Sequence, residues 1–237
     1  IYRTDANGST LYFVDEVANG VTSYVDSLDD ETLLTKQTIY TTGGVLNNDA
    51  PPLAKTIHTV NSVNWYGNIK QGTSIKENRM MQSVIGDPDS VPATNYVDLE
   101  DSIVAISSYM DRALAMCKNS IYRVDGTFDE LGFGDPIVQK VADTIGCISE
   151  DSIVQTPQGV FFASNTGFAF TDGFKCFNVS NDFNKTYKDF IVHEEQRLHI
   201  NATYDRVNNR VFFSLHTLDN LEGEPDRMFI CDLRWGI

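Results

Sequence analysis

The chain has 237 residues, of which 41% are hydrophobic and 11% aromatic, and its formal net charge is −15. This length allows one large β domain or two smaller domains with a proper core, and the aromatic content favours strands over helices. The charge excludes a nucleic-acid-binding surface of the usual basic kind, because neutralising phosphates requires Lys and Arg. It is compatible with solubility alone, or with an acidic wall past which DNA moves without sticking.

Residues 1–50 are expected to form a small β-rich segment that ends in a linker. Short strands are predicted at residues 1–4, 10–17 and 21–26, and Tyr2, Tyr12 and Tyr24 recur with the rhythm of a small β-sandwich. Residues 27–34 are compatible with one helical turn, capped by Ser27 or Asp29, or with an acidic loop. Residues 47–52 have the composition of a linker.

Residues 51–237 contain four copies of a repeated pattern of apolar runs. The first runs begin near Ile57, Ile103, Ile153 and Ile200, at intervals of 46, 50 and 47 residues. Second runs follow at residues 62–66, 113–117, 160–164 and 211–215, and third runs at 79–85, 120–124, 167–171 and 227–233. Units of this length with four strands each are typical of β-propeller blades.

The character of individual runs supports this architecture. Residues 113–117 and 160–164 are almost continuously apolar, as expected of strands covered on both faces. Residues 175–180 alternate polar and apolar side chains, as expected of a half-exposed outer strand. We therefore predict an all-β protein, with propeller-like four-stranded blades over residues 51–237, while a stack of β-sandwiches is the alternative. Flanking sequence of a longer protein is expected to supply further blades.

The four cysteines, Cys117, Cys147, Cys176 and Cys231, lie in or beside apolar runs without CxxC spacing. We expect buried free thiols in a reducing compartment, although the sequence does not exclude a disulfide. No apolar stretch approaches the ~20 residues of a membrane span, and no signal peptide is recognisable.

No set of residues in the sequence indicates catalysis. The histidines form no metal-binding spacing, and His58 and His199 share a position in their repeats, which favours a structural role. No GxSxG or phosphate-binding glycine loop is present, so we predict no catalytic residue, no metal site and no cofactor. The acidic clusters at residues 86–89 and 125–130 could hold calcium, but they lack the regular spacing of calcium loops, and Asp-Pro and Asp-Gly are ordinary turn formers.

The one basic concentration lies at residues 175–197, where Lys175, Lys185, Lys188 and Arg197 alternate with aromatic side chains. Such a patch could bind nucleic acid, but Asp182, Asp189, Glu194 and Glu195 cancel its charge. We interpret residues 181–197 as a long, partly helical connection that contacts another subunit.

The order of several loose motifs resembles the tail tubular or nozzle proteins of short-tailed bacteriophages. The relevant stretches are residues 78–83, 86–90, 96–99 and 103–106, followed by 119–126 and 146–173. Residues 1–4, 12–14 and 22–26 resemble the fibronectin-like strands that precede the propeller in that family. The resemblance covers nearly the whole chain, which is shorter than a full nozzle protein.

The resemblance implies a structural virion protein of the phage tail, assembled in the bacterial cytoplasm. Several copies, usually six, would form a ring below the portal and the tail adaptor protein, with tail fibres or spikes as further partners. Genomic DNA would pass through the axis without sequence-specific binding. The family brings no catalytic residues.

Two other functions are compatible with the pattern. A glycan-binding, glycan-cleaving or receptor-binding propeller would expose tryptophan or paired carboxylates at its mouth, whereas Trp65 and Trp235 both lie in strand-like runs. A peptide-binding intracellular scaffold propeller would carry the WD and GH signatures of the common class, which are absent.

Overall fold

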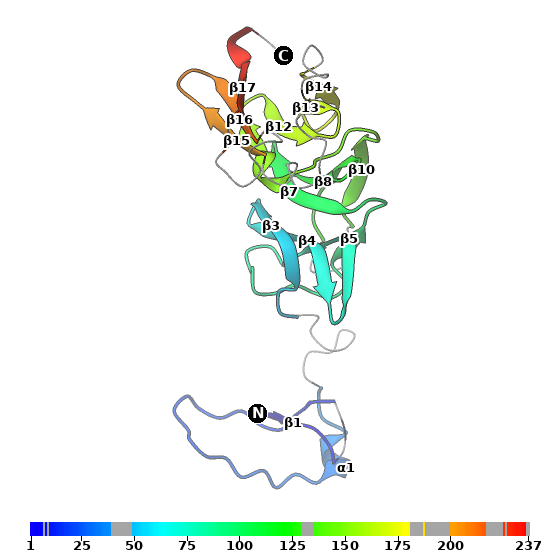
Figure 1. Cartoon of the computed structure of the whole chain (residues 1–237). Coiled ribbons are helices and arrows are strands. Elements are labelled where there is room, and N and C mark those ends of the chain that lie inside the picture. Colours follow the sequence, from blue (N-terminus) through cyan, green and yellow to red (C-terminus); the bar gives the residue numbers. More distant parts are fainter. Residues whose placement is uncertain are drawn as a thin grey trace. The chain divides into compact units, whose positions relative to one another are not determined.

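The computed structural model describes residues 1–6, 8, 10–38, 49–128, 135–180, 187, 200–216, 225 and 227–235. The chain divides into two compact units, Ile1–Asn47 and Asn48–Ile237. Nearly all of the described regular structure is β-strand (Figure 1), which confirms the predicted all-β class.

The first unit contains a two-stranded antiparallel sheet, formed by β1 (Tyr2–Arg3) and β2 (Tyr12–Phe13), and one helical turn, α1 (Asp30–Leu33). Asp29 caps this turn, because its Oδ1 accepts a hydrogen bond of 2.7 Å from the amide of Thr32. The helical alternative for residues 27–34 is therefore confirmed, with Asp29 as the cap.

The strand predicted at residues 21–26 is not formed. The turn before it exists, since Gly20 has a φ of 96° and the amide of Val21 donates to the carbonyl of Ala18 over 3.2 Å. The segment beyond is exposed and extended, in the wide loop of the first unit in Figure 1. Among the unit's described hydrophobic side chains only Val14 and Leu33 are buried, so there is little core over which strands could pair.

The second unit consists of successive antiparallel meanders. The first sheet contains β3 (Leu53–Val60), β4 (Val63–Gln71), β5 (Ser74–Gln82) and β6 (Tyr96–Asp98), and the second contains β7 (Ile103–Tyr109), β8 (Arg112–Cys117), β9 (Ile121–Asp125) and β10 (Ile137–Ala142). The third sheet contains β11 (Val154–Thr156), β12 (Gly159–Ser164), β13 (Gly167–Thr171) and β14 (Cys176–Asn178). The fourth contains β15 (Asn201–Asp205), β16 (Arg210–Leu215) and β17 (Arg227–Asp232).

These strands follow the predicted repeat. The second and third apolar runs of every unit fall in the second and third strands of the corresponding sheet. Residues 175–180 contain β14, which is the outermost strand of its sheet, as predicted. The fourth sheet differs from the prediction of four strands, because only three strands belong to it within the described residues.

Three hydrophobic clusters join the four sheets in chain order. One contains Trp65 and Met80 of the first sheet with Ile103 and Ala115 of the second. Another lies between the second and third sheets, and the last between the third and fourth. Each inner sheet therefore buries both of its faces, which explains why β8 and β12 are almost continuously apolar.

Candidate assembly surface

The two faces of each sheet have different neighbours, and we name them accordingly. The leading face is turned toward the sheet that precedes in the chain, and the trailing face toward the sheet that follows. In β12, Val160 and Phe162 belong to the cluster shared with the second sheet, whereas Phe161 and Ala163 belong to the cluster shared with the fourth. This alternation follows from the two-residue period of a strand.

The trailing faces of the third and fourth sheets are built alike. In the third sheet Phe161 pairs with Phe170, and Ala163 pairs with Phe168. In the fourth sheet Phe212 pairs with Ile230, and Ser214 pairs with Met228. Val211 and Phe213 lie on the leading face of the fourth sheet, so Phe212 and Ser214 of the same strand lie on its trailing face. Phe212 and Ser214, with their partners Ile230 and Met228, therefore occupy the positions that Phe161, Ala163, Phe170 and Phe168 have in the third sheet.

The two trailing faces differ in what covers them. Phe161 is 0% exposed and Phe168 is 4% exposed, and the rings of Phe168 and Phe213 stack with centroids 4.0 Å apart. In the fourth sheet Met228 is 62% exposed and Ile230 is 57% exposed. The fourth sheet thus presents to solvent an apolar strand pair whose counterpart in the third sheet is buried.

The first sheet ends the series on the other side. Its leading face carries a cross-strand row formed by Ile57, Tyr66, Met81 and Tyr96. Ile57 is 57% exposed and Tyr96 is 39% exposed, but Tyr66 is buried beneath the chain at Pro88, whose carbonyl accepts a hydrogen bond from the tyrosine hydroxyl. This face is therefore open along β3 and β6 and covered in its middle.

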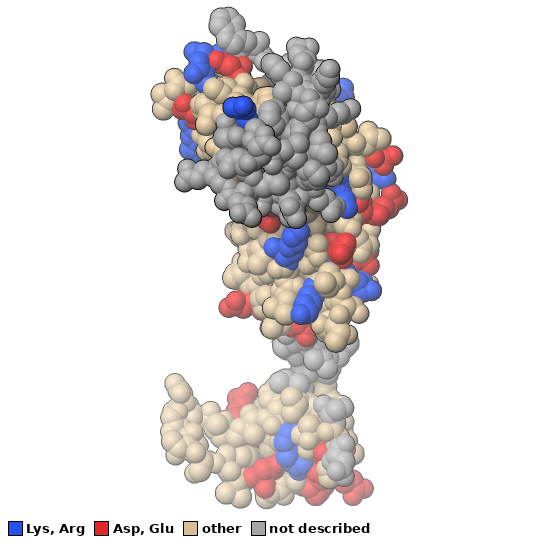
Figure 2. Space-filling model, in the orientation of Figure 1, with Lys and Arg blue, Asp and Glu red and all other residues tan. Residues whose placement is uncertain are grey.

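Each of these two faces carries an ion pair. On the leading face of the first sheet, Arg79 binds Asp98 and its guanidinium lies 3.8 Å from the ring centroid of Tyr96. On the trailing face of the fourth sheet, Nε of Arg210 lies 3.0 Å from a carboxylate oxygen of Asp232. Figure 2 shows acidic and basic side chains interspersed over the visible face, and the described residues form no continuous basic area there.

A polar seam joins the first strands of three successive sheets. Nε2 of His58 in β3 lies 2.9 Å from the hydroxyl of Ser108 in β7, and the side-chain amide of Gln155 in β11 donates to that hydroxyl over 3.1 Å. Burial lowers the pKa of His58. His58 thus links neighbouring sheets, in keeping with the structural role predicted for it, and His199 lies outside the described residues.

A buried arginine connects the second and third sheets away from this seam. Arg123 in β9 is 7% exposed and donates to Asp125 over 2.8 Å and to the carbonyl of Gly173 over 3.1 Å. It also donates to Gln139, and its guanidinium lies 4.3 Å from the ring centroid of Phe174. Arg123 therefore fixes the predicted Asp172-Gly173 turn of the third sheet, in which Gly173 has a φ of 79°, to the second sheet.

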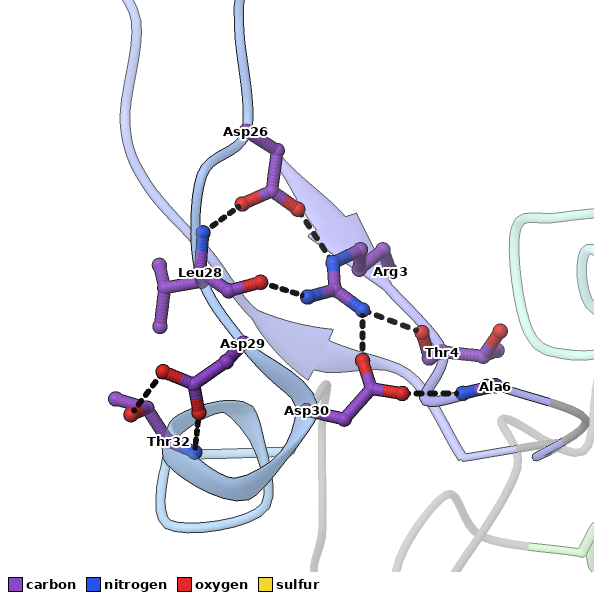
Figure 3. A network of polar contacts seen from close by, with 8 residues as sticks. All are labelled: Arg3, Thr4, Ala6, Asp26, Leu28, Asp29, Asp30 and Thr32. Atoms are coloured by element: carbon purple, nitrogen blue, oxygen red, sulfur yellow. Dashed lines mark hydrogen bonds and ion pairs between the residues drawn. The ribbon is translucent and has the colours of Figure 1, made fainter.

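The first unit has a polar network of its own (Figure 3), centred on Arg3. The guanidinium binds Asp26 and Asp30, with 2.6 Å to Asp30, and it also donates to the carbonyl of Leu28. The amide of Ala6 donates to Asp30 over 2.9 Å. The contact of Arg3 with Asp26 holds the C-terminal end of the exposed segment at residues 15–27 beside β1. The amino group of Ile1 donates to the carbonyl of Asp15 and holds the other end.

The cysteines are free thiols, as predicted. Cys117 and Cys147 are fully buried within the sheet clusters, and Cys176 and Cys231 are partly exposed. Burial raises the pKa of Cys147 to about 12 and raises that of Cys117 further, with the charge of Asp101 as a second cause for Cys117. These groups pack as small apolar side chains and are poor nucleophiles.

Of the acidic clusters that were candidate calcium sites, the second begins at an ion-paired residue. Asp125 is bound by Arg112 and Arg123, which explains the start of the second acidic cluster without calcium, and residues 129–130 lie outside the described residues. Among the described residues no group of three or more His, Cys, Asp or Glu side chains could hold a metal ion.

No helix in the described ranges is long and apolar enough to cross a membrane.

The predicted aromatic and basic patch is only partly described, because residues 181–186 and 188–199 lie outside the described residues. Tyr187 is fully buried, and its ring lies edge-on to Phe168 with centroids 4.9 Å apart. Its hydroxyl donates to the carbonyl of Ser164 over 2.6 Å. Tyr187 is therefore a core residue and cannot stack on nucleic-acid bases.

Comparison with known proteins assigns no family to this chain. No protein-family model matches it, and a search of curated proteins finds no match.

The trailing face of the fourth sheet is the feature that sequence reasoning missed. The runs at residues 160–164 and 211–215 have nearly the same apolar sequence, and both occupy the second position of their repeats. The strand that pairs with each run carries the signal that could have shown the difference. Residues 227–232 place Met228, Ile230 and the charged Asp232 on one face, whereas residues 167–171 contain only apolar or small side chains.

Proposed function

We propose that this protein is a structural component of a bacteriophage tail, of the nozzle or tail tubular type. In this proposal the four sheets are successive blades of a β-propeller, preceded by a fibronectin-like segment in the first unit. The observation that carries the proposal is the order of packing, because each sheet buries its trailing face against the leading face of the next. Propeller blades bury their faces in this way.

The contacts between first strands support the same arrangement. The polar seam joins β3, β7 and β11, and the hydroxyl of Ser149, just before the third sheet's first strand, donates to the carbonyl of Ile200 over 3.0 Å, just before β15. Neighbouring first strands around an axis are expected of blades. In this proposal, further sheets of the propeller would cover the exposed apolar side chains at both ends of the series.

In the virion, several copies would form a ring below the portal and the tail adaptor, with six copies expected from the family resemblance. Tail fibres or spikes would attach to this assembly, which forms in the host cytoplasm. The net charge of −15 suits a conduit through which DNA passes, because like charges repel and the genome would not adhere. Neither catalysis nor a cofactor is part of the proposal.

Sedimentation velocity of the purified 237-residue chain over a wide concentration range tests this function. The proposal predicts one discrete assembly of several 26.5-kDa copies, growing at the expense of monomer as concentration rises. A monomer at every concentration and salt condition would contradict self-assembly. A DNA mobility-shift assay in parallel should detect no binding at physiological salt.

A glycan-binding module is the second candidate, favoured by one hollow of the second unit. Its volume is about 410 Å³, and Tyr96, Phe128 and Asp135 line it together with Thr94 and Val97. Two aromatic rings beside a carboxylate could contact a sugar, although the guanidinium of Arg79 lies over one face of Tyr96. Binding of the chain to a glycan array, abolished by Phe128→Ala, would favour this candidate over the structural one.

A further inference from the structure

We propose that the hollow between the first and second sheets binds an arginine or lysine side chain of a partner protein. The hollow has a volume of about 410 Å³, and Tyr96, Phe128 and Asp135 line it together with Thr94 and Val97. The second candidate function assigns the same hollow to a sugar, from which a basic side chain differs in its charge. The inference does not depend on the assembly of a ring.

The hollow lies along the outer edge of β6. Tyr96 and Val97 are consecutive in this strand, so their side chains point to opposite faces, and a hollow that contacts both residues reaches the strand's edge. β6 is the outermost strand of the first sheet, and within the described residues it pairs with β5 alone. Phe128 and Asp135 belong to the connection between β9 and β10 of the second sheet. The walls therefore come from two neighbouring sheets of the same chain.

A buried glutamine fixes the position of Phe128. Gln82 in β5 is 0% exposed, and its side-chain oxygen accepts a hydrogen bond of 3.0 Å from the amide of Phe128. The side-chain nitrogen of Gln82 donates to the carbonyl of Phe128 over 3.4 Å. This reciprocal pair holds the β9–β10 connection against the first sheet. A site whose residues are fixed before the ligand arrives loses less conformational entropy on binding.

The aromatic rings of the hollow suit a cation. Tyr96 is 39% exposed, and the guanidinium of Arg79 already lies 3.8 Å from its ring centroid in a cation–π contact. Asp98 accepts two hydrogen bonds of 2.7 Å from Arg79, which neutralise the charge of that arginine. Arg79 therefore does not oppose a second cation in the hollow, where Phe128 provides a further ring.

The charge around the hollow favours a cation over a sugar. Residues 86–101 contain five Asp or Glu side chains, residues 125–135 contain four, and neither segment contains Lys or Arg. Asp98 and Glu100 each bind a basic side chain, whereas Asp135 is exposed and has no ion pair within the described residues. A carboxylate beside aromatic rings in acidic surroundings attracts a guanidinium or an ammonium group, and a neutral sugar gains nothing from this charge.

The position at a strand edge favours a protein segment over a free small cation. An extended segment can add to an open strand edge through backbone hydrogen bonds while one of its side chains fills a neighbouring hollow. β6 offers such an edge beside the hollow. The predicted ligand is therefore a basic residue within an extended segment of the partner.

The experiment measures the binding of labelled short peptides to the 237-residue chain by fluorescence anisotropy. One peptide carries a central arginine between threonine and valine residues, and its counterpart carries citrulline, which is neutral and has nearly the same shape. The protein variants are Asp135→Asn and Phe128→Ala. The matched control, Asp111→Asn, removes the same charge from an exposed turn residue whose φ of 60° suits asparagine. Circular dichroism and thermal unfolding establish that each variant folds like the wild-type chain.

We expect the arginine peptide to bind about 10-fold or more tightly than the citrulline peptide. Asp135→Asn and Phe128→Ala should each weaken its binding by about 3- to 30-fold, while Asp111→Asn leaves it unchanged. Blocked arginine without flanking residues should bind more weakly than the peptide.

Equal binding of the two peptides, or no binding of the arginine peptide at about 1 mM, would overturn the inference. Blocked arginine that binds as tightly as the peptide would overturn the assignment to a partner protein. A neutral glycan whose binding is lost in Phe128→Ala, without binding of the arginine peptide, would overturn the inference in favour of the second candidate function. None of these results decides whether the chain assembles into a ring.

Discussion

Phe161 and Phe212 occupy equivalent positions in the second strands of consecutive sheets, yet Phe161 is fully buried and Phe212 is only partly buried. The difference arises from the fourth sheet, which covers the first ring and has no described counterpart over the second. We predict that Phe161→Ala lowers the free energy of unfolding by about 3–5 kcal/mol. Phe212→Ala in the unassembled chain should cost less than about 1.5 kcal/mol.

Urea unfolding of both variants at a concentration below assembly measures this pair, with the slope of the transition checked for constancy. Equal costs for the two substitutions in the monomer would contradict the stacking of the third sheet on the fourth.

Arg123 should matter far more to stability than an arginine in an exposed ion pair. Its guanidinium joins the carbonyl of Gly173 to Asp125 and Gln139 inside the protein, so Arg123→Ala leaves buried acceptors without donors. We expect a loss of roughly 2–4 kcal/mol. The matched control, Arg79→Ala, removes an exposed pair with Asp98 and should cost about 1 kcal/mol or less.

Thermal unfolding of these two variants provides the measurement. Arg123→Lys should recover little of the loss, because an ammonium group cannot reproduce the forked contacts of a guanidinium. If Arg123→Ala proved as harmless as Arg79→Ala, the link between the second and third sheets would be wrong.

The buried thiols predict a defined pattern of chemical reactivity. At pH 8 a disulfide reagent should leave Cys117 and Cys147 unmodified in the folded protein, because both thiols are fully buried and the reagent cannot reach them. Cys176 and Cys231 are partly exposed and should react first. Mass spectrometry of alkylated peptides identifies the modified residues, and rapid labelling of Cys147 in folded protein would contradict its placement.

The same thiols predict a pH dependence of stability. A thiol with a raised pKa keeps its proton in the folded state, whereas the unfolded state ionises near pH 8.5. The free energy of unfolding should therefore be unaffected below about pH 8 and should fall as the pH rises toward 12, the value for Cys147. Cys147→Ala should reduce the slope of this fall in urea titrations at several pH values.

The Arg3 network predicts an acid-sensitive segment in the first unit. The hydrogen bond from Arg3 is the largest cause that lowers the pKa of Asp30, and the hydrogen bond from the Ala6 amide is the second. The hydrogen bond from the Leu28 amide, together with Arg3, lowers the pKa of Asp26. The contribution of both carboxylates is present at neutral pH and is lost as the pH falls through their lowered pKa values. Hydrogen exchange at residues 15–30 should therefore accelerate, relative to the intrinsic exchange rate at each pH, below about pH 4.

Arg3→Gln should produce the same acceleration at neutral pH, while Lys36→Gln, which removes a cation outside the network, should not. Hydrogen–deuterium exchange with peptide resolution separates these cases. Unchanged protection of residues 15–30 in Arg3→Gln would show that the network does not hold the segment.

Strand positions were predictable because the two-residue period and the turn residues are local signals. The runs at residues 113–117 and 160–164 correctly indicated strands covered on both faces. The strand at residues 211–215 has a similar apolar sequence but is buried on one face only. The amino-acid sequence of a strand does not determine whether another sheet packs against each of its faces. The contact of Arg123 with Gly173 joins residues 50 positions apart, and only the packing of one sheet on the next brings them together.

The failed strand at residues 21–26 has a comparable physical reason. Its sequence favours extended backbone, and the Asn19-Gly20 turn forms as predicted. A strand also needs a partner and an apolar face to bury, and the first unit offers few buried side chains among those described. Propensity therefore determined the local backbone but not the pairing.

Electron microscopy of the assembled chain tests the central claim most directly. Averaged images of particles separated by sedimentation should show a symmetric ring of several copies around an open axis. Images that show only isolated monomers, or compact oligomers without an axial opening, would contradict the account of this protein as a ring-forming conduit.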